Sequence, residues 1–281
     1  MRIRTPAARG LDPLKLTVCE LPTNLSPDHT AWADFARHIE RTEADLVLLN
    51  EMPFGAWVAR EPRFDADLAA ASIAAHESAL PALRQLPAAV LGSRPIRGRD
   101  KLCNEAFLLA DGVYKPIHHK HYFPQEEGYF EETWFAPLRP GFDVTEYRGL
   151  RIGVLLCTEL MFTEWARHYR RQGAHVIVSP RASGHSMRRW DVAARMAAIV
   201  SGCYVLSSNR VSHGANSGQH FGGHGFAYSP TGELLNETSE ATPLLSVNID
   251  VSLVAEAQRS YPCNVRELVP WARKSRRRPA S

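Results

Sequence analysis

The hydrophobic pattern along the chain alternates between two kinds of element. Short apolar runs, which are typical of buried strands, lie at residues 14–20, 45–50, 87–93, 175–180, 203–209 and 243–250. Apolar residues at helical spacing lie at residues 30–42, 65–85 and 187–201. Ser26 and Asp28 are the predicted N-terminal caps of the first helix, because such side chains accept hydrogen bonds from free backbone N–H groups.

Three predicted hairpins interrupt this alternation. Their turns lie at residues 111–112, 148–149 and 230–232, and each turn ends in glycine. A sheet wound purely from strand–helix–strand units does not contain such hairpins. The pattern therefore favours an α/β fold with two mixed sheets, each covered by helices on its outer face.

The chain shows no internal repeat and no low-complexity linker, so the sequence predicts one domain. We expect a disordered leader at residues 1–13, the domain at residues 14–270, and a basic tail at residues 271–281. A C-terminal arm is expected from about residue 251, and its apolar residues predict that it docks on a neighbouring subunit.

The composition is typical of a globular protein without a membrane-spanning segment. The chain has 281 residues, of which 44% are hydrophobic and 22% charged, as in ordinary globular proteins. It contains no apolar run long enough to cross a bilayer and no apolar core of a secretory signal near its start. Its five cysteines are irregularly spaced and form no CxxC pair, which favours a reducing, cytoplasmic location.

The charge distribution argues against nucleic-acid binding. The net charge is +3, but five positive charges lie within residues 273–278. The rest of the chain is therefore net negative and does not offer a basic surface. We expect neither nucleic-acid nor membrane partners.

Three polar residues stand where apolar runs end or in adjoining loops: Glu51, Lys120 and Cys157. In open α/β sheets, ligands bind at the carboxyl ends of the strands. Cys157 also precedes a predicted helix, in which Met161, Trp165 and Tyr169 recur every four residues, and a helix N-terminus favours a thiolate. Each residue alone is more typical of core packing or of the solvated surface, so the candidate site depends on the three together.

Three stretches carry a resemblance to a known family: LVLLNEMPFGAW, HHKHYFPQEEGYFEETWFAPLRPGF and RIGVLLCTELMFTEWARHYRRQGAHVIVSPRAS. They resemble the nitrilase, or carbon–nitrogen hydrolase, superfamily over residues 14–250. The resemblance implies a four-layer α-β-β-α sandwich and a catalytic triad of Glu51, Lys120 and Cys157. The second stretch is similar to that of N-carbamoyl amidohydrolases, and it implies that Glu131 is a supporting glutamate.

The resemblance also implies a reaction. Cys157 would attack the carbonyl carbon of a linear amide or N-carbamoyl compound and form a covalent intermediate, releasing ammonia or an amine. Glu51 would transfer the proton, Glu131 would orient Lys120 or the substrate, and Lys120 and the backbone N–H of Thr158 would stabilise the oxyanion. The family requires no metal or organic cofactor, and its members commonly form homodimers or larger homo-oligomers.

Two alternatives remain open at this point: a non-catalytic relative that uses the same cleft for binding, and nitrile hydrolysis. The intact triad favours an enzyme, and the loop favours an amide over a nitrile. The family usually has proline where this chain has Asn50 and glutamine where it has Glu20. These departures leave the exact substrate open.

Trp57 and Arg181 follow predicted strands of the site and are candidate substrate contacts. Arg181 would pair with a substrate carboxylate. The histidines suggest a metal site, but HHKH lacks the i, i+4 spacing of a zinc-binding helix and Lys120 at its centre would repel a cation. We therefore expect no metal, and we expect the Gly- and His-rich segment 212–225 to form a mobile loop near the cleft. The histidines weighed here are His118, His119, His121, His213, His220 and His224.

Overall fold

The computed structural model of the chain describes residues 13–212 and 221–266. The predicted leader and basic tail therefore lie almost entirely outside the described residues. His213, His220 and most of the predicted loop at 212–225 also lie outside them. No helix in the two described ranges is long and apolar enough to cross a bilayer.

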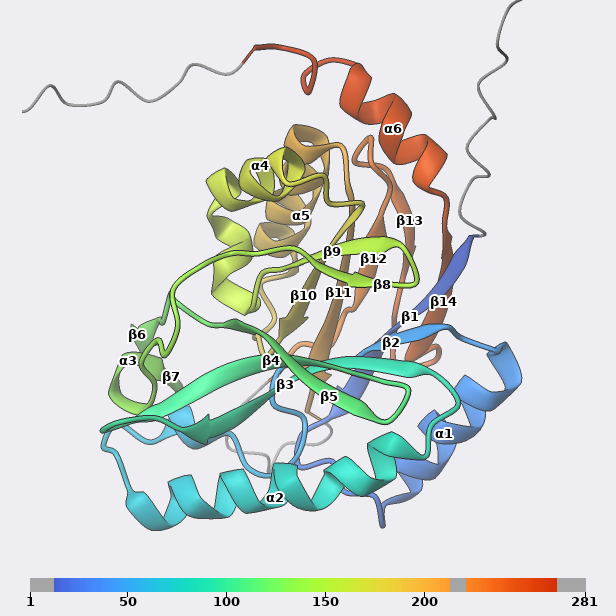
Figure 1. The fold of residues 1–281 in the computed structure, drawn as a ribbon. Helices are drawn as coiled ribbons and strands as arrows, with labels where there is room; N and C mark the ends of the chain where they lie inside the picture. Colours follow the sequence, from blue (N-terminus) through green and yellow to red (C-terminus); the bar gives the residue numbers. More distant parts are fainter. Residues whose placement is uncertain (1–12, 213–220, 267–281) are drawn as a thin grey trace, which may run out of the picture.

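Two mixed sheets form the centre of the molecule and are joined through one strand (Figure 1). The first sheet contains, in spatial order, β5 (Val113–His119), β4 (Leu102–Ala110), β3 (Ala89–Arg97), β2 (Leu46–Leu48), β1 (Leu14–Pro22) and β14 (Leu244–Ile249). The second sheet contains β8 (Thr145–Tyr147), β9 (Leu150–Val154), β10 (Val176–Arg181), β11 (Tyr204–Val211), β12 (Phe226–Tyr228) and β13 (Leu234–Glu237). The last residues of β1 pair with the end of β11, which connects the sheets.

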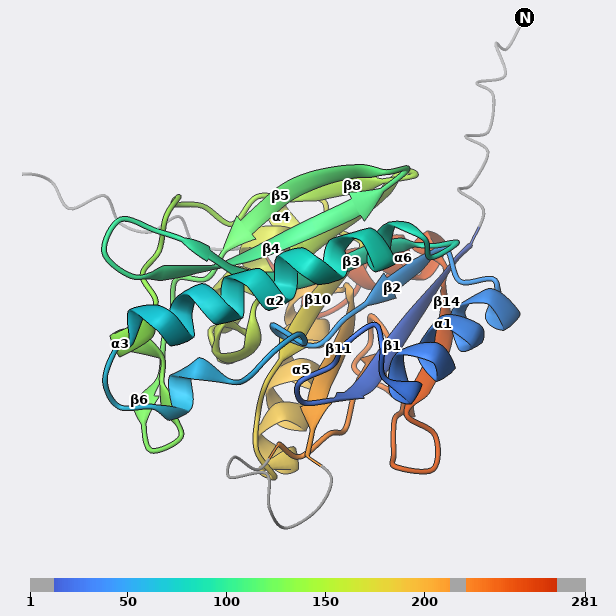
Figure 2. The same cartoon turned by 90° about the horizontal axis from the view of Figure 1, so that it is seen from below.

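Helices cover the outer face of each sheet. α1 (Thr30–Thr42) and α2 (Ala66–Arg84) lie on the first sheet, and α4 (Thr163–Arg171) and α5 (Met187–Ser201) lie on the second (Figures 1 and 2). Apolar side chains from both sheets form one inner core, to which the first sheet contributes Leu48, Leu91 and Leu108 and the second contributes Val154, Val178 and Leu206. The structure thus has the predicted α-β-β-α layers.

The turns of two predicted hairpins have the backbone conformation that their sequences suggest. Asp111 and Arg148 both adopt positive φ, 51° and 48°, and each is followed by a glycine that also has positive φ. Such turns match the twist of the strands that they connect. The β4–β5, β8–β9 and β12–β13 pairs are antiparallel, as predicted.

The structure describes the first part of the predicted C-terminal arm, up to residue 266. Residues from 251 form α6 (Val251–Arg259), which packs on its own domain, where Val254 joins the inner core. The side chain of Gln258 donates hydrogen bonds to the carbonyl oxygens of Ala174 and Ser201. The helix therefore has a docking site within its own chain.

The N-terminal caps also differ in part from prediction. α1 begins after His29 without a side-chain cap, so Ser26 and Asp28 do not have the predicted role. At α2, by contrast, Asp65 Oδ1 accepts hydrogen bonds from the backbone N–H groups of Asp67 and Leu68, at 2.9 and 3.0 Å.

Replacing Asp65 by alanine should lower the free energy of unfolding by about 1 kcal/mol, because two backbone N–H groups lose their acceptor. Urea denaturation of the wild type and the variant measures this difference. Asp67→Ala in the same first turn is the matched control, since Asp67 does not cap the helix through its side chain. An equal loss in both variants would show that first-turn charge, not capping, stabilises α2.

Candidate active site

The three candidate catalytic residues follow strands that end at the same edge of the two sheets. Glu51 comes after β2, Lys120 directly follows β5, and Cys157 comes after β9. Backbone hydrogen bonds fix these ends: Glu51 N–H donates to Arg181 O at the end of β10, and Lys120 N–H donates to Asn104 O on β4, at 3.1 and 2.9 Å. The carboxyl ends of strands from both sheets therefore meet at one place, as ligand sites of α/β proteins do.

Lys120 connects two carboxylates in the interior. Its Nζ atom lies 2.8 Å from Glu51 Oε1 and 2.5 Å from Glu131 Oε2, and all three side chains are buried. Burial alone disfavours the ammonium form of Lys120, but the negative charges of Glu131 and Glu51 outweigh burial and raise its pKa above the ordinary value. Lys120 is therefore a fixed positive charge at neutral pH.

Burial raises the pKa of the Glu131 carboxyl, although the charge of Lys120 opposes this shift. The negative charge of Glu51 raises it further.

Sequence reasoning missed Asn104, which holds Glu51 in place. Asn104 Nδ2 donates a hydrogen bond to Glu51 Oε1 at 2.8 Å, so that this oxygen has two partners. Glu51 Oε2 has no hydrogen-bond partner among the described residues. The only sequence signal for Asn104 is the polar pair Asn104–Glu105 within the largely apolar strand LCNEAFLLA.

Cys157 begins a short 3₁₀ helix, η2 (Cys157–Met161), rather than the predicted α-helix, which starts later at Thr163. Its φ angle is +48°, a left-handed conformation that is uncommon for residues other than glycine. This conformation marks a sharp turn between β9 and η2. Strained backbone of this kind persists where the surrounding structure fixes it, and it occurs often at active sites.

The prediction of an acidic Cys157 thiol is wrong for this structure. Burial raises its pKa above the ordinary value, and the negative charges of Glu51 and Glu131 raise it further. Lys120 and a hydrogen bond with the Ala182 backbone lower it, but by less. The resting residue is therefore a neutral thiol, which must lose its proton to a base during attack.

A cavity of about 490 Å³ opens beside Cys157. Glu131 and Thr158 line it together with Cys157, which brings the predicted oxyanion-hole residue to the same surface as the nucleophile. Aromatic and apolar side chains form part of the wall of the cavity: Tyr129, Met161 and Trp190. Two charged side chains, Glu126 and Arg189, also line it.

Arg181 has a different role from the one predicted. Its buried guanidinium donates to Ser207 Oγ and Ser183 Oγ, at 2.7 and 3.0 Å, and to the backbone oxygen of His224. Its side chain also packs 4.9 Å from the ring centre of Trp190. The guanidinium is therefore occupied within the protein and is not placed to pair with a substrate carboxylate.

Trp57 is also buried behind the cavity rather than in its wall. Its Nε1 atom donates to Gly128 O at 3.1 Å, and its ring lies 6.2 Å from the ring of Tyr129, which does line the cavity. The predicted substrate contact is thus an indirect one, since Trp57 supports Tyr129.

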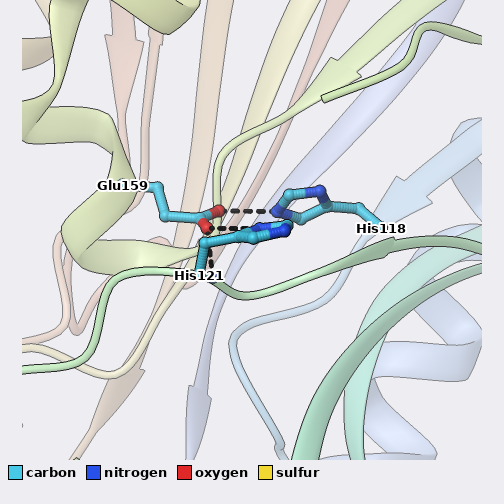
Figure 3. A group of neighbouring side chains, drawn as sticks. All are labelled: His118, His121 and Glu159. Atoms are coloured by element: carbon cyan, nitrogen blue, oxygen red, sulfur yellow. Dashed lines mark hydrogen bonds and ion pairs between the residues drawn. The ribbon is translucent and has the colours of Figure 1, made fainter. Parts of the chain in front are cut away.

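Two of the histidines converge on one carboxylate (Figure 3). His118 Nε2 lies 2.7 Å from Glu159 Oε2, and the backbone N–H of His121 donates to Glu159 Oε1 at 2.7 Å. The candidate ligand atoms of these three side chains lie within 4.8 Å of one another. The ammonium of Lys120 contacts Glu51 and Glu131 and is not among these three candidate ligands.

Comparison with known proteins identifies the family of this chain. A model of the carbon–nitrogen hydrolase family matches residues 7–259. The N-carbamoylputrescine amidase of Arabidopsis thaliana is 28% identical over 171 residues, which cover 56% of this chain and 57% of the relative. The citrullinase of Francisella tularensis is 28% identical over 146 residues, or 48% of this chain and 51% of the relative. The chain thus spans about half the length of these curated relatives.

A solved structure supports the fold. A carbon–nitrogen hydrolase from Helicobacter pylori superposes with a TM-score of 0.78 and 20% sequence identity, covering 90% of this chain and 94% of that one. At this identity, the likeness concerns the arrangement of helices and strands.

Proposed function

The chain belongs to the carbon–nitrogen hydrolase family, and we propose that it hydrolyses a linear amide or N-carbamoyl compound through a covalent intermediate on Cys157. One observation carries the proposal: a buried ammonium, Lys120, is held between Glu51 and Glu131 beside a cysteine that faces a cavity. Buried charges are costly unless they are paired, and they concentrate at functional sites.

In the proposed first step, Glu51 accepts the thiol proton as the sulfur of Cys157 attacks the carbonyl carbon. Oε2 of Glu51 supports this role, because it is the carboxylate oxygen without a hydrogen bond to any described residue. A neutral resting thiol needs such a base. The proton of the S–H bond thus goes to the carboxylate, and the electron pair of that bond forms the new S–C bond.

The tetrahedral intermediate carries a negative oxygen. Lys120 and the backbone N–H of Thr158 stabilise it, and one such donor lowers a barrier by about 3–4 kcal/mol. Glu131 holds Lys120 in position through the 2.5 Å contact. Glu51 then returns its proton to the nitrogen, the C–N bond breaks, and ammonia or an amine leaves. Attack of water, again with Glu51 as base, releases the acid and regenerates the thiol.

The cavity supports a small substrate with a polar or charged end. Its volume, about 490 Å³, suits a linear molecule of modest size, and Glu126 and Arg189 contribute one negative and one positive side chain. The named relatives act on N-carbamoylputrescine and, by its name, on citrulline. Both are linear carbamoyl compounds with a charged far end, and we propose this class for the present protein.

A substrate panel tests the proposal. Aliphatic amides, N-carbamoyl amines, N-carbamoyl amino acids and nitriles are incubated with the enzyme, and ammonia release is measured. We expect activity on the carbamoyl compounds, and mass spectrometry should detect an added acyl or carbamoyl group on the Cys157 peptide. Activity on nitriles alone, or the absence of any adduct from hydrolysed substrates, would overturn the assignment.

A further inference from the structure

Glu159 connects the two segments that carry Cys157 and Lys120. Its Oε2 atom accepts a hydrogen bond from the backbone N–H of Leu156 at 2.8 Å, directly before Cys157. Its Oε1 atom accepts one from the backbone N–H of His121 at 2.7 Å, directly after Lys120. One carboxylate thus holds a residue adjacent to the nucleophile and a residue adjacent to the ammonium.

His118 completes this arrangement from the end of β5 (Figure 3). Its Nε2 atom lies 2.7 Å from Glu159 Oε2, and both side chains are buried. With the proton on Nε2, the imidazole donates the third hydrogen bond to the carboxylate. Burial opposes the charge of Glu159, but His118 and the hydrogen bonds around it lower its pKa to about 2. The carboxylate is therefore ionised at neutral pH and needs all its donors.

We propose that Glu159 and His118 are positioning residues, which fix the relative placement of Cys157 and Lys120 through this three-donor arrangement. The inference rests on the proposed function. The backbone of Cys157 is strained, with φ of +48°, and such a conformation relaxes unless its neighbours hold it. The Glu159 bond to Leu156 N–H holds the residue immediately before this turn.

A metal ion is the competing explanation for the same three side chains. The ring nitrogens of His121 and Nδ1 of His118 make no hydrogen bond within the described residues, and the candidate ligand atoms lie within 4.8 Å of one another. The hydrogen bonds favour the positioning role, because both oxygens of Glu159 already accept from N–H groups. Two substitutions of His118 separate the two explanations.

The test compares His118→Gln with His118→Leu in the full-length enzyme, alongside Glu159→Gln. Glutamine can place an amide N–H near the position of Nε2 and donate to Glu159, but it is a poor ligand for transition metals. Leucine fills similar space without a donor. Glu159→Gln keeps the shape but leaves one oxygen for three N–H donors.

We expect His118→Leu and Glu159→Gln to lower kcat by about 100-fold, because a displacement of about 1 Å at a reacting group has this effect. KM should change by less than about threefold, since neither side chain lines the cavity. His118→Gln should retain at least about tenfold more activity than His118→Leu. Circular dichroism confirms that each variant is folded.

A second measurement does not depend on hydrolysis. The rate at which iodoacetamide alkylates Cys157, followed by mass spectrometry of its peptide, should fall in His118→Leu and Glu159→Gln and recover in His118→Gln. If the wild type hydrolyses no compound but the alkylation rates follow this order, the proposed function fails and the positioning role stands. Equal alkylation and equal kcat in all folded variants would overturn the positioning role. Stoichiometric metal in the wild type, lost equally in both His118 variants with their activity, would overturn it in favour of a metal site.

Discussion

Replacing Cys157 by serine is expected to abolish hydrolysis, with a fall in kcat on the order of 10⁴-fold or more. A serine hydroxyl is far less acidic than a thiol, and this site already disfavours an anion on residue 157 through burial and the charges of Glu51 and Glu131. The substitution exchanges one buried atom for a smaller one in a residue that lines the cavity. Steady-state ammonia release and the thermal unfolding curve measure the two effects separately.

The matched control is Cys203→Ala. Cys203 is also buried, but it lies directly before β11, where its Sγ atom donates to the backbone oxygen of Ala174. This control should lose some stability, because it opens a small space in the core, and it should keep its activity. If Cys157→Ser hydrolysed the substrates at a rate comparable with the wild type, the covalent route would have to be abandoned.

The placement of Glu51 and Cys157 at the site could be predicted from the sequence because it depends on local patterns. Glu51 and Cys157 follow apolar runs that form β2 and β9, and the carboxyl ends of parallel strands lie at one edge of a sheet. Lys120 required the family resemblance, since a lysine in a polar loop is ordinarily solvated. The family and the layered fold are both confirmed.

The ionisation of Cys157 could not be predicted in the same way. The sequence shows a thiol before a helical pattern, and that local view favours a thiolate. In the structure, burial of the thiol raises its pKa, and so do two carboxylates from distant segments, Glu51 and Glu131. These effects depend on tertiary packing. They raise the pKa of Cys157, whereas the local sequence predicts that it is lowered.

The roles of Arg181 and Asn104 also could not be predicted from the sequence. Arg181 follows a catalytic strand, yet Ser207 and Ser183 on neighbouring segments bind its guanidinium inside the protein. Asn104 is one of two adjacent polar residues near the start of a largely apolar strand, and its side chain donates a hydrogen bond to Glu51. Which side chain faces the site is decided by strand pairing, which a single sequence does not fix.

Replacing Glu51 by glutamine should lower kcat by about 10²–10⁴-fold, the range typical of losing a general acid and base. Glutamine keeps an oxygen that can accept from Lys120 and Asn104, so the geometry of the site should persist. It places an amide where Oε2 now lies, and an amide neither accepts the thiol proton nor delivers it to the leaving nitrogen. Ammonia release under substrate saturation measures this loss.

The same substitution should lower the pKa of the Cys157 thiol, although it lowers the activity. The charge of Glu51 raises the thiol pKa, so its removal lowers that pKa, and the alkylation of Cys157 should reach half its maximal rate at a lower pH than in the wild type. Glu77→Gln is the control, because this carboxylate lies exposed on α2 and pairs with Arg94 instead of the catalytic lysine; it should leave both measurements unchanged. A variant with a more acidic thiol but little turnover would show that proton delivery to the leaving nitrogen, and not thiolate formation alone, requires Glu51. If Glu51→Gln turned over normally, another group would have to carry the proton, and Glu131, whose carboxyl pKa is raised by burial, would be the next residue to substitute.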